Sequence, residues 1–409
     1  MAGETQSRGA AARRFGAGAA KLILGGRFER ALWPVLATVA MNFTGFGTLT
    51  SYFGLWLIQA QHVDVRTVST ALFCAGLAGA CGAGFAGTLV DRLGPRRVNV
   101  AIATLHAAAT IALAFPVGTG TAIGLLAVVT GTQPLRGVAQ RTLIGQLGQQ
   151  TGGEKAFADY RLVLNVGLLS GPLMGAVVLQ WGWQALRIDV CVLYFLALLP
   201  AVALYRTPET PAAGPRAPVV RPAARLLDRK LILLVAGSSC AWTVMYVYEA
   251  VLPILVVGSE TLSASQWGLL YSLGPLLALV GQLRVQRWFR AFRPSARLAG
   301  GVLLMGFAFA VFWGGFRVWV LPVFIVLFVL GDLVWGPASE DVAVRAAPEG
   351  RTGAYLGAVS STVWVGSALA PAVGLPAAQH YGNGVLWAGA AALSVVSALC
   401  YANLSRLAR

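Results

Sequence analysis

Long apolar segments constrain this sequence more than any other feature. Read with a window of about 19 residues, the 409-residue chain divides into twelve apolar segments separated by short polar joints. Each segment can cross a hydrocarbon core of about 30 Å as a helix, and none shows the alternation of membrane strands. The segments are residues 32–58, 67–90, 98–116, 121–145, 157–180, 185–205, 231–257, 264–283, 298–316, 319–339, 354–378 and 384–404.

The basic residues predict how these helices are oriented. Of 31 Lys and Arg residues, 25 fall in the two ends and the joints on one side, and only Arg66, Arg187 and Arg317 fall in the opposite joints. Basic residues are retained on the cytoplasmic side. We therefore expect a multi-pass protein of the cell membrane, surrounded by lipid, with both termini cytoplasmic. The same bias accounts for the net charge of +16 without a nucleic-acid partner.

The chain contains a repeat. Gly167, Pro172 and Gly175 in the fifth segment match three residues of the eleventh at a constant offset of 199, namely Gly366, Pro371 and Gly374. This predicts an all-α membrane protein of two pseudo-symmetric six-helix bundles, and parallel halves of this kind are typical of secondary transporters. The expected parts are a cytoplasmic tail (1–31), an amino-terminal bundle (32–205), a Pro-rich linker (206–228) and a carboxy-terminal bundle (229–409).

The joint after the second segment reads "AGTLVDRLGPRRV" and carries charge directly behind an apolar run. It resembles the loop signature of the major facilitator superfamily, and the matching residues are Gly87, Asp91, Arg92, Gly94, Arg96 and Arg97. The glycine spacing suits close helix packing. The resemblance implies that Asp91 faces the positive start of helix eleven, near Thr352, and ties the halves together while the transporter faces outward. The alternative is that these charges only end helix two.

Two further resemblances point to exporters within this superfamily. "NVGLLSGPLMG" is similar to the antiporter signature of helix five, carried here by Gly167, Gly171, Pro172 and Gly175. "GDLVWGPASEDVAVRAAPEGRTGAYLGAVSS" is similar to helix ten and the start of helix eleven in proton-driven drug exporters. The alternative for the first motif is ordinary small-residue packing. Together these resemblances imply the drug:proton antiporter branch with twelve helices.

Acids within the apolar segments are candidates for proton coupling, because a membrane-embedded carboxylate is costly. Asp332 lies near the middle of its segment, Glu249 lies in the outer half of another, and Asp189 lies close to an end. We expect Asp332 and Glu249 to carry coupling, with Glu249 also touching substrate. The alternative for each acid is a structural role beside an arginine or a hydroxyl, and His106 is a further candidate for proton relay.

Aromatic and amide side chains near helix middles are the candidates for substrate binding. Rings beside acids suit lipophilic, often cationic molecules. The candidates are Asn42, Phe46, Tyr52, Trp56, Gln133, Trp242, Tyr246, Glu249, Trp335 and Trp364. The alternatives are contacts between helices for the amides and an interfacial belt for the rings.

Three classes of function remain to be weighed. A proton-coupled exporter of small lipophilic or cationic compounds is favoured, and a proton-coupled uptake symporter for a metabolite is the alternative. A membrane enzyme or sensor is disfavoured, because the sequence has no phosphate loop, zinc spacing or Ser-His-Asp order. The five cysteines, all within apolar segments, read as core residues. We expect no metal, no cofactor and a monomer.

Overall fold

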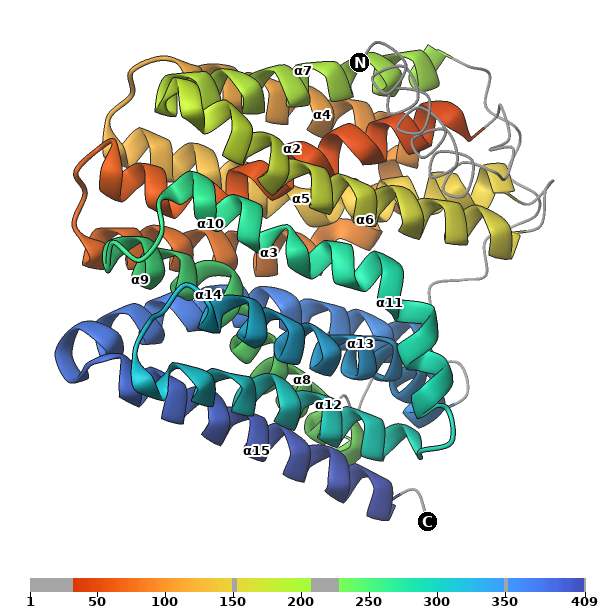
Figure 1. Cartoon of the computed structure of the whole chain (residues 1–409). Helices are drawn as coiled ribbons and strands as arrows, with labels where there is room; N and C mark the ends of the chain where they lie inside the picture. Colours follow the sequence, from red (N-terminus) through yellow and green to blue (C-terminus); the bar gives the residue numbers. More distant parts are fainter. Residues whose placement is uncertain (1–31, 149–152, 207–227, 349–351, 408–409) are drawn as a thin grey trace, which may run out of the picture.

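A computed structural model describes residues 32–148, 153–206, 228–348 and 352–407, so the expected tail and nearly all of the linker lie outside the described residues. The structure is a stack of long helices whose two halves occupy the upper and lower parts of Figure 1. The helices of the amino-terminal half are α2 (Trp33–Gln59), α3 (Val65–Leu93), α4 (Pro95–Ala114), α5 (Thr119–Gly148), α6 (Gly153–Val178) with η1 (Leu179–Trp181), and α7 (Trp183–Arg206).

The carboxy-terminal half repeats this arrangement with more broken helices. Its elements are α8 (Arg229–Tyr246), η2 (Val247–Val251), α9 (Leu252–Gly258), α10 (Ala264–Tyr271), α11 (Leu273–Phe289), α12 (Pro294–Ala308), η3 (Phe309–Gly314), α13 (Val320–Ala346), α14 (Thr352–Tyr381) and α15 (Asn383–Leu407). Within the described residues, eleven helical spans are long and apolar enough to cross a membrane. The 27-residue α2, packed against α6 and α7, is a twelfth long helix.

The predicted repeat is visible in how the fifth and eleventh long helices pack. A Cβ added at Gly167 of α6 would lie 3.2 Å from the backbone nitrogen of Thr44, and one added at Gly366 of α14 would lie 2.7 Å from that of Thr243. Thr44 and Thr243 are separated by the same offset as the two glycines. Helix five therefore packs on helix one as helix eleven packs on helix seven, which confirms the two pseudo-symmetric bundles.

Several helix ends are explained by local sequence. Asp64 begins α3 by accepting hydrogen bonds from the backbone nitrogen and the hydroxyl of Thr67, at 2.9 and 2.7 Å. These bonds hold the pKa of the Asp64 carboxyl below its usual value. The eighth apolar segment is broken at Ser272, between α10 and α11. Pro275 in the first turn of α11 has no N–H to offer the carbonyl of Tyr271, so one helical hydrogen bond is missing next to this break.

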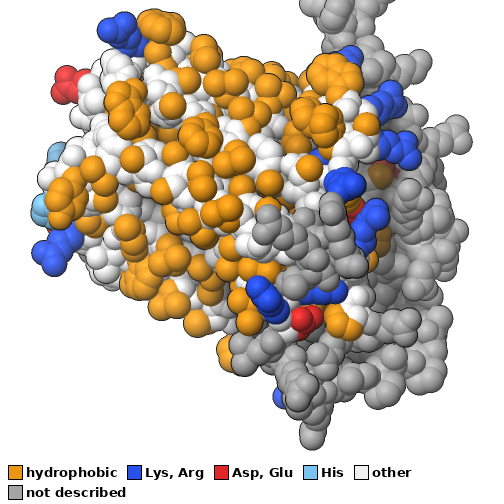
Figure 2. Space-filling model, turned by 90° about the horizontal axis from the view of Figure 1, so that it is seen from below, with side chains coloured by type: hydrophobic (Ala, Val, Ile, Leu, Met, Phe, Trp, Pro, Cys, Tyr) orange, Lys and Arg blue, Asp and Glu red, His pale blue; other side chains and the backbone are white. Residues whose placement is uncertain are grey.

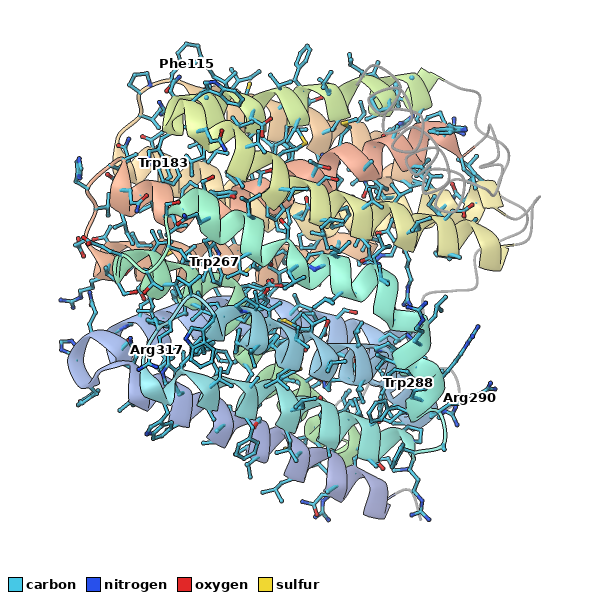
Figure 3. The ribbon with its side chains drawn as sticks, viewed as in Figure 1. Phe115, Trp183, Trp267, Trp288, Arg290 and Arg317 are labelled. Atoms are coloured by element: carbon cyan, nitrogen blue, oxygen red, sulfur yellow. The ribbon has the colours of Figure 1, made fainter. Side chains whose placement is uncertain are left out.

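The outer surface of the bundle is suited to lipid. Figure 2 shows apolar side chains across the middle of one face, with basic side chains gathered toward its two ends. Phe307, Val323 and Leu399 are among the large apolar residues exposed to the surroundings. Figure 3 places Phe115 and Arg317 at one end of the bundle and Trp288 and Arg290 at the other. Aromatic and basic residues are typical of the two interfaces of a membrane.

Candidate functional site

Asp332 and Glu249 lie in the interior of the carboxy-terminal half. Asp332 is near the middle of the 27-residue α13, and Glu249 is in η2, between α8 and α9. They lie in the same region of this half, where the charge of Asp332 acts on the Glu249 carboxyl group. Both side chains are half-buried. The structure therefore brings together two carboxyl groups that stand 83 positions apart in the sequence.

A π-helical turn positions Glu249. Residues Val247–Val251 form a π-helix inserted between two α-helical segments, and Pro253 follows in the first turn of α9. A π-turn accommodates one extra residue and often marks a functional position. The Tyr271 hydroxyl, at the end of α10, lies near the Glu249 carboxylate and interacts with it. Glu249 therefore has a partner on a second helix. Tyr271 is not among the candidate residues that the sequence indicates.

Aromatic rings surround this pair of acids. Tyr248 stacks on Tyr271 with ring centroids 5.3 Å apart, and Trp242 meets Trp335 edge-on at 5.4 Å. The Trp335 indole donates a hydrogen bond of 3.1 Å to the Tyr401 hydroxyl. The Trp242 and Tyr246 ring centroids are 6.4 Å apart. Three predicted substrate residues thus form one group of rings, which we call the aromatic cluster (Trp242, Tyr246 and Trp335).

The remaining predicted substrate residues lie elsewhere. Asn42 and Gln133 are buried inside the amino-terminal half, and Phe46 is half-buried on α2. Trp364 of α14 packs against Gly79 of α3, so it lies at the junction of the halves. The structure does not gather these four residues with the aromatic cluster.

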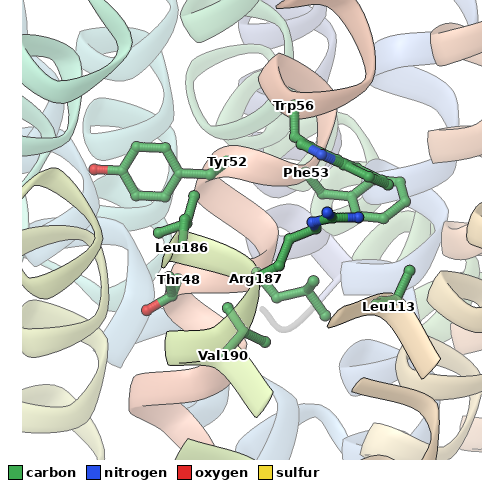
Figure 4. A pocket seen from close by; sticks show the side chains of 9 residues that line it. Thr48, Tyr52, Phe53, Trp56, Leu113, Leu186, Arg187 and Val190 are labelled. Carbon is green, nitrogen blue, oxygen red and sulfur yellow. The ribbon is translucent and has the colours of Figure 1, made fainter. Parts of the chain in front are cut away.

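Tyr52 and Trp56 line a small cavity between α2, α4 and α7 (Figure 4). The Arg187 guanidinium carbon lies 5.6 Å from the centroid of the Trp56 ring. The cavity has about 30 Å³ of free space, enough for a water molecule or so, whereas pockets for drug-sized ligands measure about 300–1,000 Å³. This cavity is therefore too small to be the substrate site in the present conformation.

The two halves touch toward one end of the bundle. Ser69 of α3 donates a hydrogen bond of 2.6 Å to the Pro371 carbonyl of α14, and Ser265 of α10 donates one of 2.5 Å to the Ala176 carbonyl of α6. Gly268 of α10 lies directly against the Tyr52 hydroxyl, which leaves no room for a side chain. These residues lie at the end of the bundle where α3 and α10 begin.

The opposite end of α3 carries the major facilitator loop motif. Gly94 ends α3 with φ of +85°, which suits glycine, and Pro95 begins α4. Arg92 and Arg97 are exposed, whereas Arg96 is buried. A Cβ added at Gly87 would have no atom within 4 Å, so the close helix approach expected there is absent from this conformation. The expected partner, the start of α14 near Thr352, directly follows residues 349–351, which lie outside the described residues.

The antiporter motif forms a close contact between α6 and α2. The Thr48 hydroxyl donates a hydrogen bond of 2.9 Å to the Gly171 carbonyl, and the Tyr52 hydroxyl donates one of 2.8 Å to the Pro172 carbonyl. Gly175 lies against the Tyr52 ring. Small residues therefore let α6 lie backbone-to-backbone with α2, which holds the Tyr52 side chain at the junction of the halves.

The comparison with known proteins identifies the class of this protein as a membrane transporter. The family model of the Major Facilitator Superfamily matches residues 4–140 and 35–371. The chain belongs to this superfamily, and it is a multi-pass membrane protein rather than an enzyme.

Curated relatives are distant. The chain is 26% identical over 284 residues to "Multidrug resistance protein MdtH" of Cronobacter sakazakii, covering 67% of this chain and 68% of that protein. It is 23% identical over 351 residues to a "Na(+), Li(+), K(+)/H(+) antiporter" of Planococcus maritimus, covering 78% and 82%. The match to "Uncharacterized MFS-type transporter YttB" of Bacillus subtilis is 22% identical and spans only 59% of that relative and 56% of this chain.

Solved structures share the fold. A POT family transporter in complex with 5-aminolevulinic acid superposes with a TM-score of 0.78 at 14% identity, covering 93% of this chain and 98% of that one. The nucleoside transporter NupG superposes with a TM-score of 0.75 at 12% identity, covering 92% and 100%. At such identities the likeness shows the fold alone.

Proposed function

We propose that this protein is a proton-coupled exporter of small lipophilic or cationic compounds that works by alternating access in the cytoplasmic membrane. The observation that carries the proposal is the pair of interacting carboxyl groups, Glu249 and Asp332, beside an aromatic cluster. A charged acid at the centre of a membrane helix costs at least about 2.5 kcal/mol. A proton or a cationic substrate removes that cost, and the two compete for the same carboxylate. Such competition is antiport in chemical terms.

Two relatives support this direction of transport, because one is named a multidrug resistance protein and another a cation/proton antiporter. The antiporter motif on α6 is a further support. In this proposal the aromatic cluster binds the apolar part of the substrate. Trp364 contributes from the junction of the halves and Phe46 from α2, and Asn42 and Gln133 act through the packing of the amino-terminal half.

The position of the contacts between the halves assigns the conformational state. With both termini in the cytoplasm, as the basic residues indicate, α3 and α10 begin on the outer side. The contacts of Ser69, Ser265 and Gly268 then close the outer side. Gly87 lies on the inner side, and a Cβ added there would meet no atom within 4 Å, so the helices are apart at that point. We therefore assign this structure to the inward-facing state.

Transport into everted membrane vesicles tests the proposal. Vesicles carrying the protein should accumulate the labelled lipophilic cation tetraphenylphosphonium when their interior is acidified, and a protonophore should abolish the accumulation. Vesicles without the protein are the control. Accumulation of a labelled metabolite by intact cells, driven by an inward proton gradient, would instead support an uptake symporter.

The loop motif gives a second testable expectation. The contacts of α3 with α14 pair Ser69 with Pro371, Gly76 with Ala368 and Gly79 with Trp364, so the helices run antiparallel. Continuing this register brings Asp91 opposite the start of α14. A carboxylate beside the positive N-terminus of a helix stabilises that contact by about 0.3–1 kcal/mol.

Asp91→Asn should therefore reduce the outward-facing population about two- to fivefold. The measurement is how much of a cysteine placed between the two halves is labelled by a reagent added from the outside. Glu260→Gln, an exposed acid in an opposite joint, should leave labelling unchanged. Equal labelling in Asp91→Asn and wild type would mean that the motif only ends helix two.

A further inference from the structure

The interior of the amino-terminal half contains a completely buried guanidinium group that the proposed transport function does not use. Arg136 lies on α5 and has no exposed surface. Its Nη1 donates a hydrogen bond of 2.7 Å to the Asn42 Oδ1 atom of α2. Its Nε and Nη2 atoms are buried without a hydrogen-bond partner. Two of the three guanidinium nitrogens therefore remain unsatisfied.

The charge of Arg136 is also not neutralised. Among the described residues, Arg136 forms no ion pair, and the ionisable groups that its charge influences are His106 and Tyr194. His106 shares a hydrogen bond of 2.8 Å with the Thr132 hydroxyl, and its ring meets the Tyr194 ring edge-on at 5.3 Å. Neither neighbour is a carboxylate, so a net positive charge lies within an apolar bundle.

Amide groups on the same face of α5 add to the unsatisfied donors. Gln133 and Gln140 stand three residues before and four residues after Arg136, a spacing that brings side chains together on a helix. Both glutamine amides are buried and lack hydrogen-bond partners, as does the Nδ2 atom of Asn42. Unpaired donors from α5 and α2, together with the unpaired Oε1 atoms of the two glutamines, thus lie in one buried region, which we call the Arg136 cluster (Arg136, Asn42, Gln133 and Gln140).

An unpaired buried charge costs several kcal/mol even after relaxation. Water could satisfy the hydrogen bonds of the Arg136 cluster, but it would leave the charge. An anion that accepts several hydrogen bonds would satisfy the unpaired donors and would also neutralise the charge of Arg136. Because Arg136 has no exposed surface, a substrate in the space between the halves does not reach it in this conformation. We propose that the Arg136 cluster holds a small monovalent inorganic anion, such as chloride, as a resident ion of the amino-terminal half.

The thermal stability of the purified full-length protein tests this proposal. Changing the buffer salt from gluconate to chloride or bromide at equal ionic strength should raise the Tm of the wild type by about 4 °C, because a ligand of the folded state stabilises it. Arg136→Gln should abolish this difference between salts. The control is Arg141→Gln on the same helix, which changes an exposed arginine and should keep the wild-type response.

An equal Tm in halide and gluconate for the wild type, or an unchanged halide response in Arg136→Gln, would overturn the proposal in favour of water. Should Arg136→Gln fail to fold, crystals of the wild type soaked in bromide give the answer. An anomalous peak within hydrogen-bond distance of the Arg136 guanidinium is the expected result, and a bromide-soaked crystal without that peak would overturn the proposal. Gln140→Leu, which keeps the charge but removes a donor, should weaken the halide response.

Discussion

Replacing Asp332 by asparagine is expected to abolish transport driven by a pH gradient while leaving exchange of neutral substrates largely intact. Asparagine mimics the permanently protonated acid, so the side chain can no longer exchange a proton for a substrate. In everted vesicles, gradient-driven accumulation should fall to the level of vesicles without the protein. Asp341→Asn, nearer the end of the same helix and paired with Arg345, is the matched control and should retain accumulation.

Glu249→Gln separates the roles of the two acids. The Glu249 carboxylate lies near the Tyr271 hydroxyl, whose ring stacks on Tyr248, so its loss should mainly weaken binding of cationic substrates. The measurement is the concentration of tetraphenylphosphonium at half-maximal transport. Loss of coupling in Glu249→Gln with normal coupling in Asp332→Asn would reverse the assignment. If neither change mattered, the coupling group would have to be sought at His106, Asp189 or Asp91.

Replacing Gly268 by leucine is expected to prevent the halves from closing where α3 and α10 begin. A side chain at this position would collide with the Tyr52 hydroxyl and would lie 3.1 Å from the Pro172 carbonyl even at Cβ. Overpacking of this kind costs about 1–3 kcal/mol, which shifts an equilibrium about 5- to 150-fold. Labelling of a central cysteine from the outside should rise by that factor, and transport should be lost.

Gly300→Leu on α12 is the control, because a Cβ there meets nothing within 4 Å. It should leave both labelling and transport unchanged. Wild-type labelling in a folded Gly268→Leu protein would show that closure of this end does not depend on the contact between α10 and Tyr52.

The overall fold could be predicted from the sequence because the membrane imposes a minimum helix length and a charge bias that are both visible in one chain. The repeat was visible because Gly167 and Gly366 must be small for the same reason, namely a close contact with the backbone of helix one or helix seven. The positions of Asp332 and Glu249 on their helices could be read from the same segments.

Other features depended on contacts that no local pattern encodes. Tyr271 was overlooked because its partner, Glu249, stands on another helix. The sequence predicts a substrate role for Asn42 and Gln133, and the structure places both inside one half, because a mid-helix position does not tell which face of a helix points inward. The conformational state also could not be predicted, since both states of a transporter share one sequence.

The π-turn at Val247–Val251 has a consequence for how this helix can vary. A π-turn absorbs one extra residue, whereas in a regular helix of 3.6 residues per turn the same residue would rotate everything beyond it by about 100° around the axis. Deleting Ala250 would restore a regular helix in which the α9 residues keep their direction relative to α8, while Glu249 loses its place in the widened turn. The π-turn therefore positions the carboxylate without rotating the outer contact surface, and a one-residue gap at this point in a homologue would signal that the acid has lost its place.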